Sequence, residues 1–358
     1  MLKKILFTFT AILLFALSDP LTLLRASASE LNFAVETVIP ENQINKKLTY
    51  FNLLIEPSEK QILEIKLRND TDKDVTVVPK IASATTNHNG VVEYGSSDVE
   101  ADSTLQYNMK DIVTTEEEVT IPAKGSYTLK LEVNMPDEEF DGVLAGGITL
   151  QEKDDESSDN GDEVSGDKSG LSIENKFAYV VAIVLQNNEN KVSPELTLND
   201  IYPDQINKRN VIKANVQNIM PMYMNQMSVN AKITEKGKSE VLYEATSESL
   251  QMAPNSNMDY PIRLNGEALK GGEYTLDMTV TSMGETWHWT KDYKIKPEIA
   301  KDLNEEDVTI QNDYTWLYIA GGIAVILLAI LLWLLFWRRK NRKEKEQEQT
   351  ERNDLELM

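Results

Sequence analysis

Side chains able to do acid–base or metal chemistry are few in this sequence and stand far apart. The only histidines are His88 and His288, 200 residues from each other. We expect them in different domains, so they predict neither a paired-histidine metal site nor a two-histidine proton relay. The chain has no cysteine, which excludes a thiol nucleophile, a thiolate metal ligand and a disulfide. Acidic pairs such as Glu138 and Glu139 are frequent, but among 58 acidic residues they indicate solvated surface more than a hydrolase pair.

Motifs for nucleotide binding and nucleophilic catalysis are also missing. The sequence has no G-x-S-x-G and no H-E-x-x-H, and the glycines between Gly266 and Gly272 lack the Lys-Ser/Thr ending that phosphate and magnesium require. The acidic segment 152–170 loosely follows the spacing of an EF-hand calcium loop. Its first position is Glu156 instead of aspartate, and its twelfth is Asp167 instead of a bidentate glutamate. We predict no catalytic site, no cofactor and no metal site, with calcium binding by this segment as an open alternative.

Two tryptophans are the first candidates for binding chemistry. Trp287, His288 and Trp289 fall in a predicted strand, where alternate side chains share a face. Both indoles therefore lie on one face and the imidazole on the other. Such a platform either stacks on a sugar or a partner protein, or packs into a sandwich core, and the core is the commoner use.

A second group of candidates combines glycine, amide and phenol groups in the first half of the chain. Gly142, Gly146 and Gly147 lie in or beside a predicted strand, where glycine marks a bulge or the close approach of a ligand or neighbouring chain. Asn87 and Tyr94 flank a predicted turn. They could hydrogen-bond to and stack on an amino sugar, although asparagine in turns commonly bonds its own backbone.

Strands are the elements that must position these residues. Short runs that alternate apolar and polar residues between turn signals predict an antiparallel sandwich of immunoglobulin-like type in each half of the chain. The fold class is therefore mainly β, with two β-sandwiches in tandem, at residues 29–151 and 171–297. The acidic segment 152–170 is expected to link them, and residues 298–315 to form an acidic stalk. The predicted strands are Phe33–Ile39, Tyr50–Ile55, Ile62–Leu67, Val75–Ile81, Tyr127–Val133, Phe177–Leu185, Leu196–Ile201, Val211–Val216, Val229–Ile233, Tyr260–Leu264, Tyr274–Val280 and Trp287–Ile295.

The two ends of the chain predict its compartment. An apolar run from Ile5 to Leu17, preceded by two lysines and followed by small residues at 26–28, predicts a secretory signal peptide over 1–28. Residues 316–337 carry no charge and span about 33 Å as a helix, which matches the hydrocarbon core of a bilayer. The basic residues that begin segment 338–358 predict a cytoplasmic tail, with the N-terminal domains outside.

The charge of the external part restricts its partners. Residues 29–337 carry 26 basic and 51 acidic side chains, so nucleic acid and anionic lipid surfaces are excluded as simple electrostatic partners. An exported chain without disulfides is typical of a bacterial envelope. A signal peptide combined with a C-terminal span suits the Gram-positive cell surface.

Each predicted domain carries its own set of short motifs, and these motifs follow one another in a specific order along the chain. In the first domain they are Phe33, Pro40, Asn42-Gln43, Tyr50-Phe51, Pro57, Asn69, the run Ala84–Asn87 with Gly90 and Tyr94, and Phe140-Asp141-Gly142 with Gly146-Gly147. In the second they are Pro194, Asn210, Asn218, the run Met252–Ser256, Gly272 with Tyr274, and Trp287. Together with the signal peptide, the span and the basic tail, this order resembles the WxL-interacting protein family of Gram-positive bacteria.

The resemblance implies binding functions. It implies a first domain that binds peptidoglycan, a second domain that binds host extracellular-matrix protein, and surface assembly with proteins that carry a WxL wall-binding domain. The W-x-L signature is itself absent, so the chain resembles the partner and anchor. We predict a non-catalytic cell-surface scaffold of adhesin type. A membrane-anchored assembly chaperone is the alternative, and a wall hydrolase with paired carboxylates in a cleft is a third class.

Overall fold

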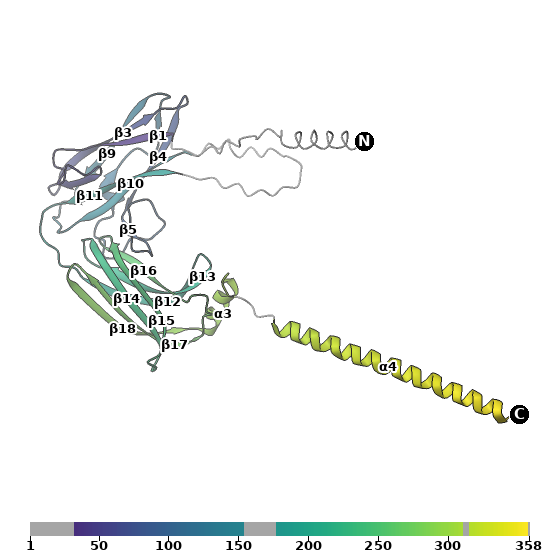
Figure 1. Cartoon of the computed structure of the whole chain (residues 1–358). Coiled ribbons are helices and arrows are strands. Elements are labelled where there is room, and N and C mark those ends of the chain that lie inside the picture. The colour runs from purple at the N-terminus through teal and green to yellow at the C-terminus, as the bar shows by residue number, and fades with distance from the viewer. Residues whose placement is uncertain (1–31, 154–176, 311–314, 357–358) are drawn as a thin grey trace, which may run out of the picture.

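The computed structural model describes residues 32–153, 177–310 and 315–356, which form two β-sandwiches and a long C-terminal helix (Figure 1). The predicted fold class is confirmed: mainly β, with two sandwiches in tandem and one apolar C-terminal helix. The predicted signal peptide at 1–28 lies outside the described residues. So does the 154–170 part of the acidic segment, on which the calcium alternative depends.

The first sandwich packs two sheets around one apolar core. One sheet holds, in spatial order, β1 (Phe33–Val38), β3 (Lys60–Asn69), β9 (Ser126–Asn134) and β7 (Val113–Thr114). The other holds β2 (Phe51–Leu54), β11 (Ala178–Gln186), β10 (Leu144–Glu152), β4 (Val75–Ser83) and β8 (Val119–Ile121). The strands follow the alternation of their sequences, as β9 shows by burying Leu129, Leu131 and Val133 between exposed residues. A short hairpin, β5 (Thr85–Thr86) with β6 (Val92–Glu93), and the one-turn helix α2 (Met109–Ile112) complete this domain.

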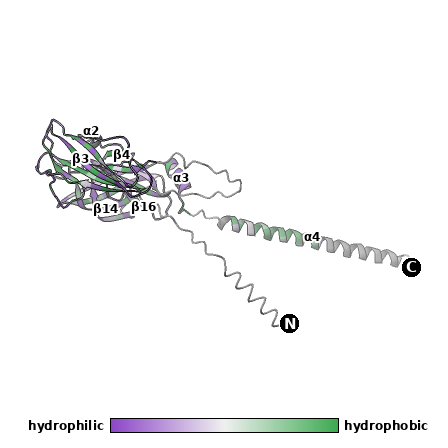
Figure 2. Ribbon diagram, turned by 90° about the horizontal axis from the view of Figure 1, so that it is seen from above, coloured by the Kyte–Doolittle hydropathy of each residue, from purple (hydrophilic) through white to green (hydrophobic). Residues whose placement is uncertain are grey.

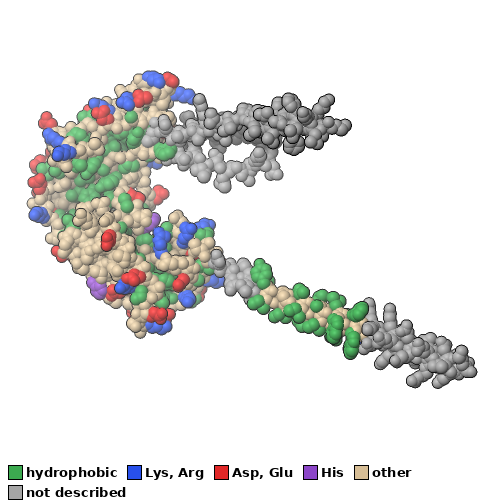
Figure 3. Space-filling model, viewed as in Figure 1, with side chains coloured by type: hydrophobic (Ala, Val, Ile, Leu, Met, Phe, Trp, Pro, Cys, Tyr) green, Lys and Arg blue, Asp and Glu red, His purple; other side chains and the backbone are tan. Residues whose placement is uncertain are grey.

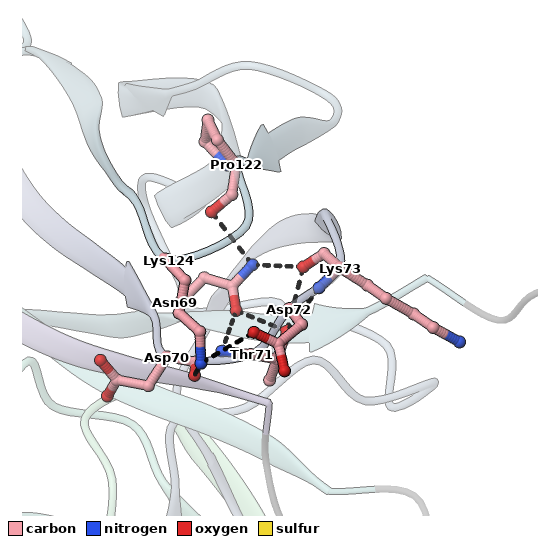
Figure 4. A network of polar contacts seen from close by, with 7 residues as sticks. All are labelled: Asn69, Asp70, Thr71, Asp72, Lys73, Pro122 and Lys124. Atoms are coloured by element: carbon pink, nitrogen blue, oxygen red, sulfur yellow. Dashed lines mark hydrogen bonds and ion pairs between the residues drawn. The ribbon is translucent and has the colours of Figure 1, made fainter.

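A buried asparagine closes the turn between β3 and β4. Asn69 Nδ2 donates to the carbonyl oxygens of Lys73 at 2.7 Å and of Pro122 at 3.1 Å (Figure 4). It also donates to the carbonyl oxygen of Ile121 at 3.1 Å. Its Oδ1 accepts from the backbone N–H and the hydroxyl of Thr71. Because a buried amide is costly unless its hydrogen bonds are made, this residue ties the turn to the end of β8.

The second sandwich also has two sheets. The smaller holds β12 (Leu196–Ile206), β13 (Arg209–Asn218) and β16 (Ser256–Arg263), and the larger holds β15 (Val241–Met252), β14 (Met224–Glu235), β17 (Gly272–Ser282) and β18 (Glu285–Ile295). Alternate residues of β14 are fully buried, among them Val229, Ala231 and Ile233. They meet the inward faces of β13 and β16 in a single core.

The boundary predicted between the sandwiches is wrong. β11 was expected to open the second sandwich, but it pairs antiparallel with β10 and parallel with β2, and its Val181, Ile183 and Leu185 belong to the first core. The first sandwich therefore extends to Gln186. The acidic segment predicted as an interdomain linker instead joins two neighbouring strands of one sheet. A central strand is recognisable from its apolar run, but the run does not say which sheet receives it.

The stalk predicted at 298–315 is also wrong over its first half. Helix α3 (Pro297–Glu306) packs on the second sandwich and buries Ala300. Asn304 Oδ1 accepts from the Leu269 amide at 2.8 Å, and Asp307 Oδ2 accepts from the Asn210 amide at 2.7 Å. These bonds fasten the helix and the residue after it to the domain, so the chain leaves the sandwich only beyond them.

The last element, α4 (Thr315–Glu356), contains the predicted span. Its segment Leu317–Arg338 has 22 residues and a mean hydropathy of 2.9, which makes it long and apolar enough to cross a membrane. None of this segment is buried against the rest of the chain. Figure 2 shows the hydrophobic colouring of this segment and Figure 3 its hydrophobic side chains, on a helix that stands apart from both sandwiches. It is a candidate membrane anchor.

Candidate functional site

The turn that carries Asn87 holds the two sandwiches together. The β5–β6 hairpin projects from the first sandwich and contacts β15 and β16 of the second. Thr86 Oγ1 and Ser256 Oγ form a buried hydrogen bond of 2.7 Å, and Thr86 Oγ1 also accepts from the Ala253 amide at 2.9 Å. The Gln251 amide donates to the Gly90 carbonyl oxygen at 2.7 Å. The hairpin is therefore part of an interdomain contact.

Asn87 uses its amide inside this turn. Its Oδ1 accepts from the backbone N–H of Asn89 at 2.9 Å and of Val91 at 3.2 Å, and its Nδ2 donates to Glu93 Oε1 at 2.7 Å. These are the local bonds that asparagine commonly makes in turns. They support a structural role for this candidate.

A second contact between the sandwiches centres on a carboxylate. Asp102 accepts from Gln217 Nε2 at 2.8 Å and from Asn257 Nδ2. Nearby, Asn255 Nδ2 donates to the carbonyl oxygen and the hydroxyl of Thr104 at 3.0 and 3.1 Å. Polar side chains from β13 and β16 thus hold the segment that follows β6. The junction thus combines a network of hydrogen bonds with a small apolar cluster, in which Ala84 and Ala145 of the first sandwich meet Ala253 of the second.

Tyr94 also lies at the junction. Its hydroxyl donates to the hydroxyl of Tyr223 in the second sandwich at 3.2 Å. Burial raises the pKa of both phenols, and most strongly that of Tyr223. Because burial penalises the charged phenolate, both rings stay neutral across physiological pH. Tyr94 is thereby held in one orientation.

At each of the three candidate glycines, backbone from another segment of the protein lies too close to leave room for a side chain. A Cβ at Gly142, where φ is +83°, would lie 2.2 Å from the Pro221 carbonyl oxygen of the second sandwich. A Cβ at Gly146 would lie 2.4 Å from the carbonyl oxygen of Ala82 in β4. A Cβ at Gly147 would lie 2.6 Å from the carbonyl oxygen of Tyr94. Of the two expected reasons for glycine here, the close approach is seen, and a neighbouring segment of the chain supplies it.

Two hollows flank the strand-to-loop segment at 93–97. The first, which we call the interdomain groove, has a volume of about 680 Å³ and is lined by Lys80–Thr85, residues 96–102, Leu105, Asn108, Lys110 and Asn255–Asn257. The second, the tyrosine hollow, has a volume of about 550 Å³ and is lined by Thr49, Tyr50, Glu93–Ser96 and Val180–Ala182. Both are within the size range of ligand sites in proteins.

The tryptophans lie on β18, away from these hollows. Trp287 and Trp289 are half-buried and pack against the core of the second sandwich, and Trp287 Nε1 donates to Glu195 Oε1 at 3.2 Å. On the opposite face His288 Nε2 lies 3.0 Å from Asp277. In the part of the chain that the structure describes, no cluster of three histidine or acidic side chains is arranged to hold a metal ion.

Several junction residues were not recognised as a site from the sequence. Asn218 is fully buried, and its Nδ2 donates to the carbonyl oxygens of Met222 and Ala253 at 2.7 and 2.8 Å. It therefore shapes the loop that presents Tyr223 and Pro221 to the first sandwich. Asn218 and the run Met252–Ser256 were among the motifs on which the family resemblance rests. That resemblance was the one feature of the sequence that pointed to these residues.

The fold and the candidate anchor define a class: a tandem β-sandwich protein with a C-terminal helix that is long and apolar enough to span a membrane. Two family descriptions match the sequence. Residues 33–152 match the peptidoglycan binding domain of the WxL Interacting Protein, and residues 168–305 match its host binding domain. The chain belongs to the WxL Interacting Protein family, as its motifs had indicated.

Other comparisons give less. No curated protein sequence matches the chain. Among solved structures, the E. coli chaperone DraB is 13% identical with a TM-score of 0.27, covering 74% of this chain and 98% of that one. The Pseudomonas aeruginosa CupB2 chaperone is 13% identical with a TM-score of 0.26, covering 68% and 96%. At these scores the likeness indicates nothing about function.

Proposed function

We propose that this chain is a non-catalytic scaffold that binds peptidoglycan through its first sandwich and assembles with WxL-domain proteins at the cell surface. The second sandwich would face outward and bind host extracellular-matrix protein. The observation that carries the proposal is the match of residues 33–152 and 168–305 to two binding domains of one family, on a chain that carries a candidate anchor. The basic residues that follow the span support a cytoplasmic C-terminus.

The tyrosine hollow is the candidate site for the glycan. Tyr50 and Tyr94 supply two aromatic rings, and Val180 beside them is 48% exposed. Sugar rings bind proteins largely by stacking on aromatic faces, with hydrogen bonds at the rim. The bond from Tyr94 to Tyr223 fixes one of these rings before a ligand arrives, which reduces the entropy lost on binding.

Charge predicts how this binding responds to salt. The external part carries about twice as many acidic as basic side chains, and a wall with phosphate polymers is also anionic. Salt shortens the screening length from about 30 Å at 0.01 M to about 10 Å at 0.1 M, which weakens repulsion and leaves stacking unchanged. Binding should therefore hold steady or strengthen as salt rises.

The test is a pull-down of the full chain in detergent with purified peptidoglycan across 0.05 to 0.5 M salt. Tyr50→Leu and Tyr94→Leu should each weaken retention by about 2- to 10-fold, since one ring contact contributes about 0.5–1.5 kcal/mol. Tyr127→Leu is the matched control, because Tyr127 lies on the opposite sheet of the same sandwich. A steep loss of binding with salt, or equal effects of all three variants, would contradict the proposed site.

A further inference from the structure

One strand of the first sandwich has an open edge. β4 pairs with β10 from Val77 to Ser83, but on its other side it pairs with β8 only from Val75 to Val77. Among the described residues, no strand pairs with Pro79–Ser83 on that side. An unpaired strand edge presents free N–H and C=O groups and can receive a further strand.

The register identifies which groups are free. The Ala84 amide donates to the Ala145 carbonyl oxygen, which sets the alternation along the β4–β10 ladder. Ala82 therefore also turns its backbone groups toward β10, whereas Ile81 and Ser83 turn theirs outward. The backbone groups of Pro79 also point outward, away from β10. Because proline has no N–H, this position costs the β4–β10 ladder no hydrogen bond. The open edge thus offers the N–H and C=O of two residues, together with the Pro79 carbonyl oxygen.

The interdomain groove runs along this edge. Six consecutive residues, Lys80–Thr85, line it, although alternate side chains of a strand point to opposite faces. The wall of the groove is therefore the edge of β4 and not one of its faces. The loop at 96–102 and the start of β16 form the opposite wall, so the space beside the edge is bounded on both sides.

Charged side chains stand on both walls. Lys80 lies on β4 and Lys110 on helix α2, whereas Asp98, Glu100 and Asp102 lie on the loop. None of the five forms an ion pair with another described residue, although Asp102 accepts hydrogen bonds from Gln217 and Asn257. A segment that fits this groove carries an acidic side chain toward the lysines, which are exposed and free to meet it.

The geometry favours a polypeptide strand from another protein. A glycan lacks the repeating N–H and C=O groups that match a strand edge at about 3.4 Å per residue. A second copy of this chain would have to bring its own β4 edge out of an equally walled groove. A single extended polypeptide segment has the matching N–H and C=O groups, and it does not have to leave a groove of its own.

We propose that the interdomain groove receives an extended, acid-bearing segment of a WxL-domain protein, which adds to the sheet beside Pro79–Ser83. This inference rests on the proposed function, since it states where and how the WxL-domain protein named there would bind. The added strand pairs with Ile81 and Ser83, and its carboxylate meets Lys80 and Lys110. Binding of this kind takes affinity from main-chain bonds and selectivity from side-chain contacts.

Amide hydrogen exchange tests the register residue by residue. In the full chain in detergent, the amides of Ala82 and Ala84 should exchange slowly, and those of Ile81 and Ser83 fast. Adding a purified WxL-domain protein should slow Ile81 and Ser83 by at least about tenfold and leave the other two unchanged. Slow exchange at Ile81 and Ser83 in the free chain would mean that the chain covers its own edge, and the inference would be wrong.

Charge reversal supplies an independent measurement. Lys80→Glu combined with Lys110→Glu should weaken the complex by about tenfold, because both partners of the carboxylate change sign. Lys66→Glu combined with Lys130→Glu is the matched control, since these exposed lysines lie on β3 and β9 of the opposite sheet. The control pair should bind as the unmodified chain does.

The remaining outcomes separate this inference from the proposed function. A complex that forms while Ile81 and Ser83 stay unprotected leaves the scaffold role intact and overturns the strand addition. No complex with any WxL-domain protein overturns both. If a soluble muropeptide protects the same two amides and the protein does not, the groove is a wall site and the strand addition is refuted.

Discussion

A single methyl group at Gly142 should loosen the two sandwiches from each other. The residue has a φ of +83°, and a Cβ there would lie 2.2 Å from the Pro221 carbonyl oxygen. The same oxygen accepts the amide of Val143 at 2.7 Å. Since Cβ contacts under 3.0 Å essentially never occur, Gly142→Ala forces the Pro221 carbonyl to retreat and breaks that bond.

The magnitude follows from two contributions. Left-handed backbone costs an alanine about 1–2 kcal/mol, and a lost hydrogen bond costs about 0.5–1.5 kcal/mol. The docking of the domains should thus weaken by about 2–3 kcal/mol, which is a factor of about 30 to 150 in the docking equilibrium. The folding of the second sandwich should change little, because the substituted residue lies in the first.

The assay is amide exchange at Gln251 and Ala253. Their amides donate across the junction to Gly90 and Thr86, so they exchange only when the domains part. In Gly142→Ala both should exchange about 30 to 150 times faster. Gly237→Ala is the control: its φ is also positive, at +79°, but no atom lies within 4 Å of the added Cβ. Equal exchange in the two variants would refute the reasoning.

Three further outcomes are expected. A fragment cut to residues 29–151 should fail to fold by circular dichroism whereas 29–190 folds, because the shorter one lacks β11, whose three core side chains contribute about 1.5–3 kcal/mol each. Asp307→Asn should lower the free energy of unfolding by about 1–2 kcal/mol at neutral pH. Burial raises the pKa of Asp307, but hydrogen bonds from Thr309 and Asn210 outweigh it and leave the pKa below its usual value. The stabilisation is therefore present at neutral pH and is lost as pH falls below about 4. Urea unfolding at pH 3 should accordingly show a smaller difference in stability between Asp307→Asn and the unmodified chain. External protease on intact cells should remove both sandwiches and spare an epitope on the tail; loss of that epitope would overturn the proposed orientation.

The strands were predictable because burial on one face leaves a period of two in the sequence. Leu129, Leu131 and Val133 illustrate this in β9. Which sheet receives a strand is a matter of pairing between distant segments, so the apolar run of β11 was assigned to the wrong domain. Helix α3 was missed because its acidic residues face solvent and only Ala300 is fully buried.

The sequence singled out several residues that lie at the junction, but not the segments that they contact. Glycines 142, 146 and 147 were expected to mark either a bulge or a close approach, and backbone of the protein itself lies close to all three. The segments that approach them come from far along the chain: Pro221 of the second sandwich meets Gly142, and Tyr223 bonds Tyr94. Local spacing contains no information about contacts of this kind, which depend on how two folded domains dock.

The place of β11 in its sheet also sets an order of events during synthesis. β2 and β10 lie on either side of β11, so neither can complete its hydrogen bonds until Gln186 has emerged. More than half of the 358 residues are therefore translated before the N-terminal sheet can close. Until then, the nascent chain exposes two unsatisfied strand edges and the apolar side chains that β11 will cover, which is a state prone to aggregate. Any factor that escorts this protein during biogenesis is needed chiefly in that interval.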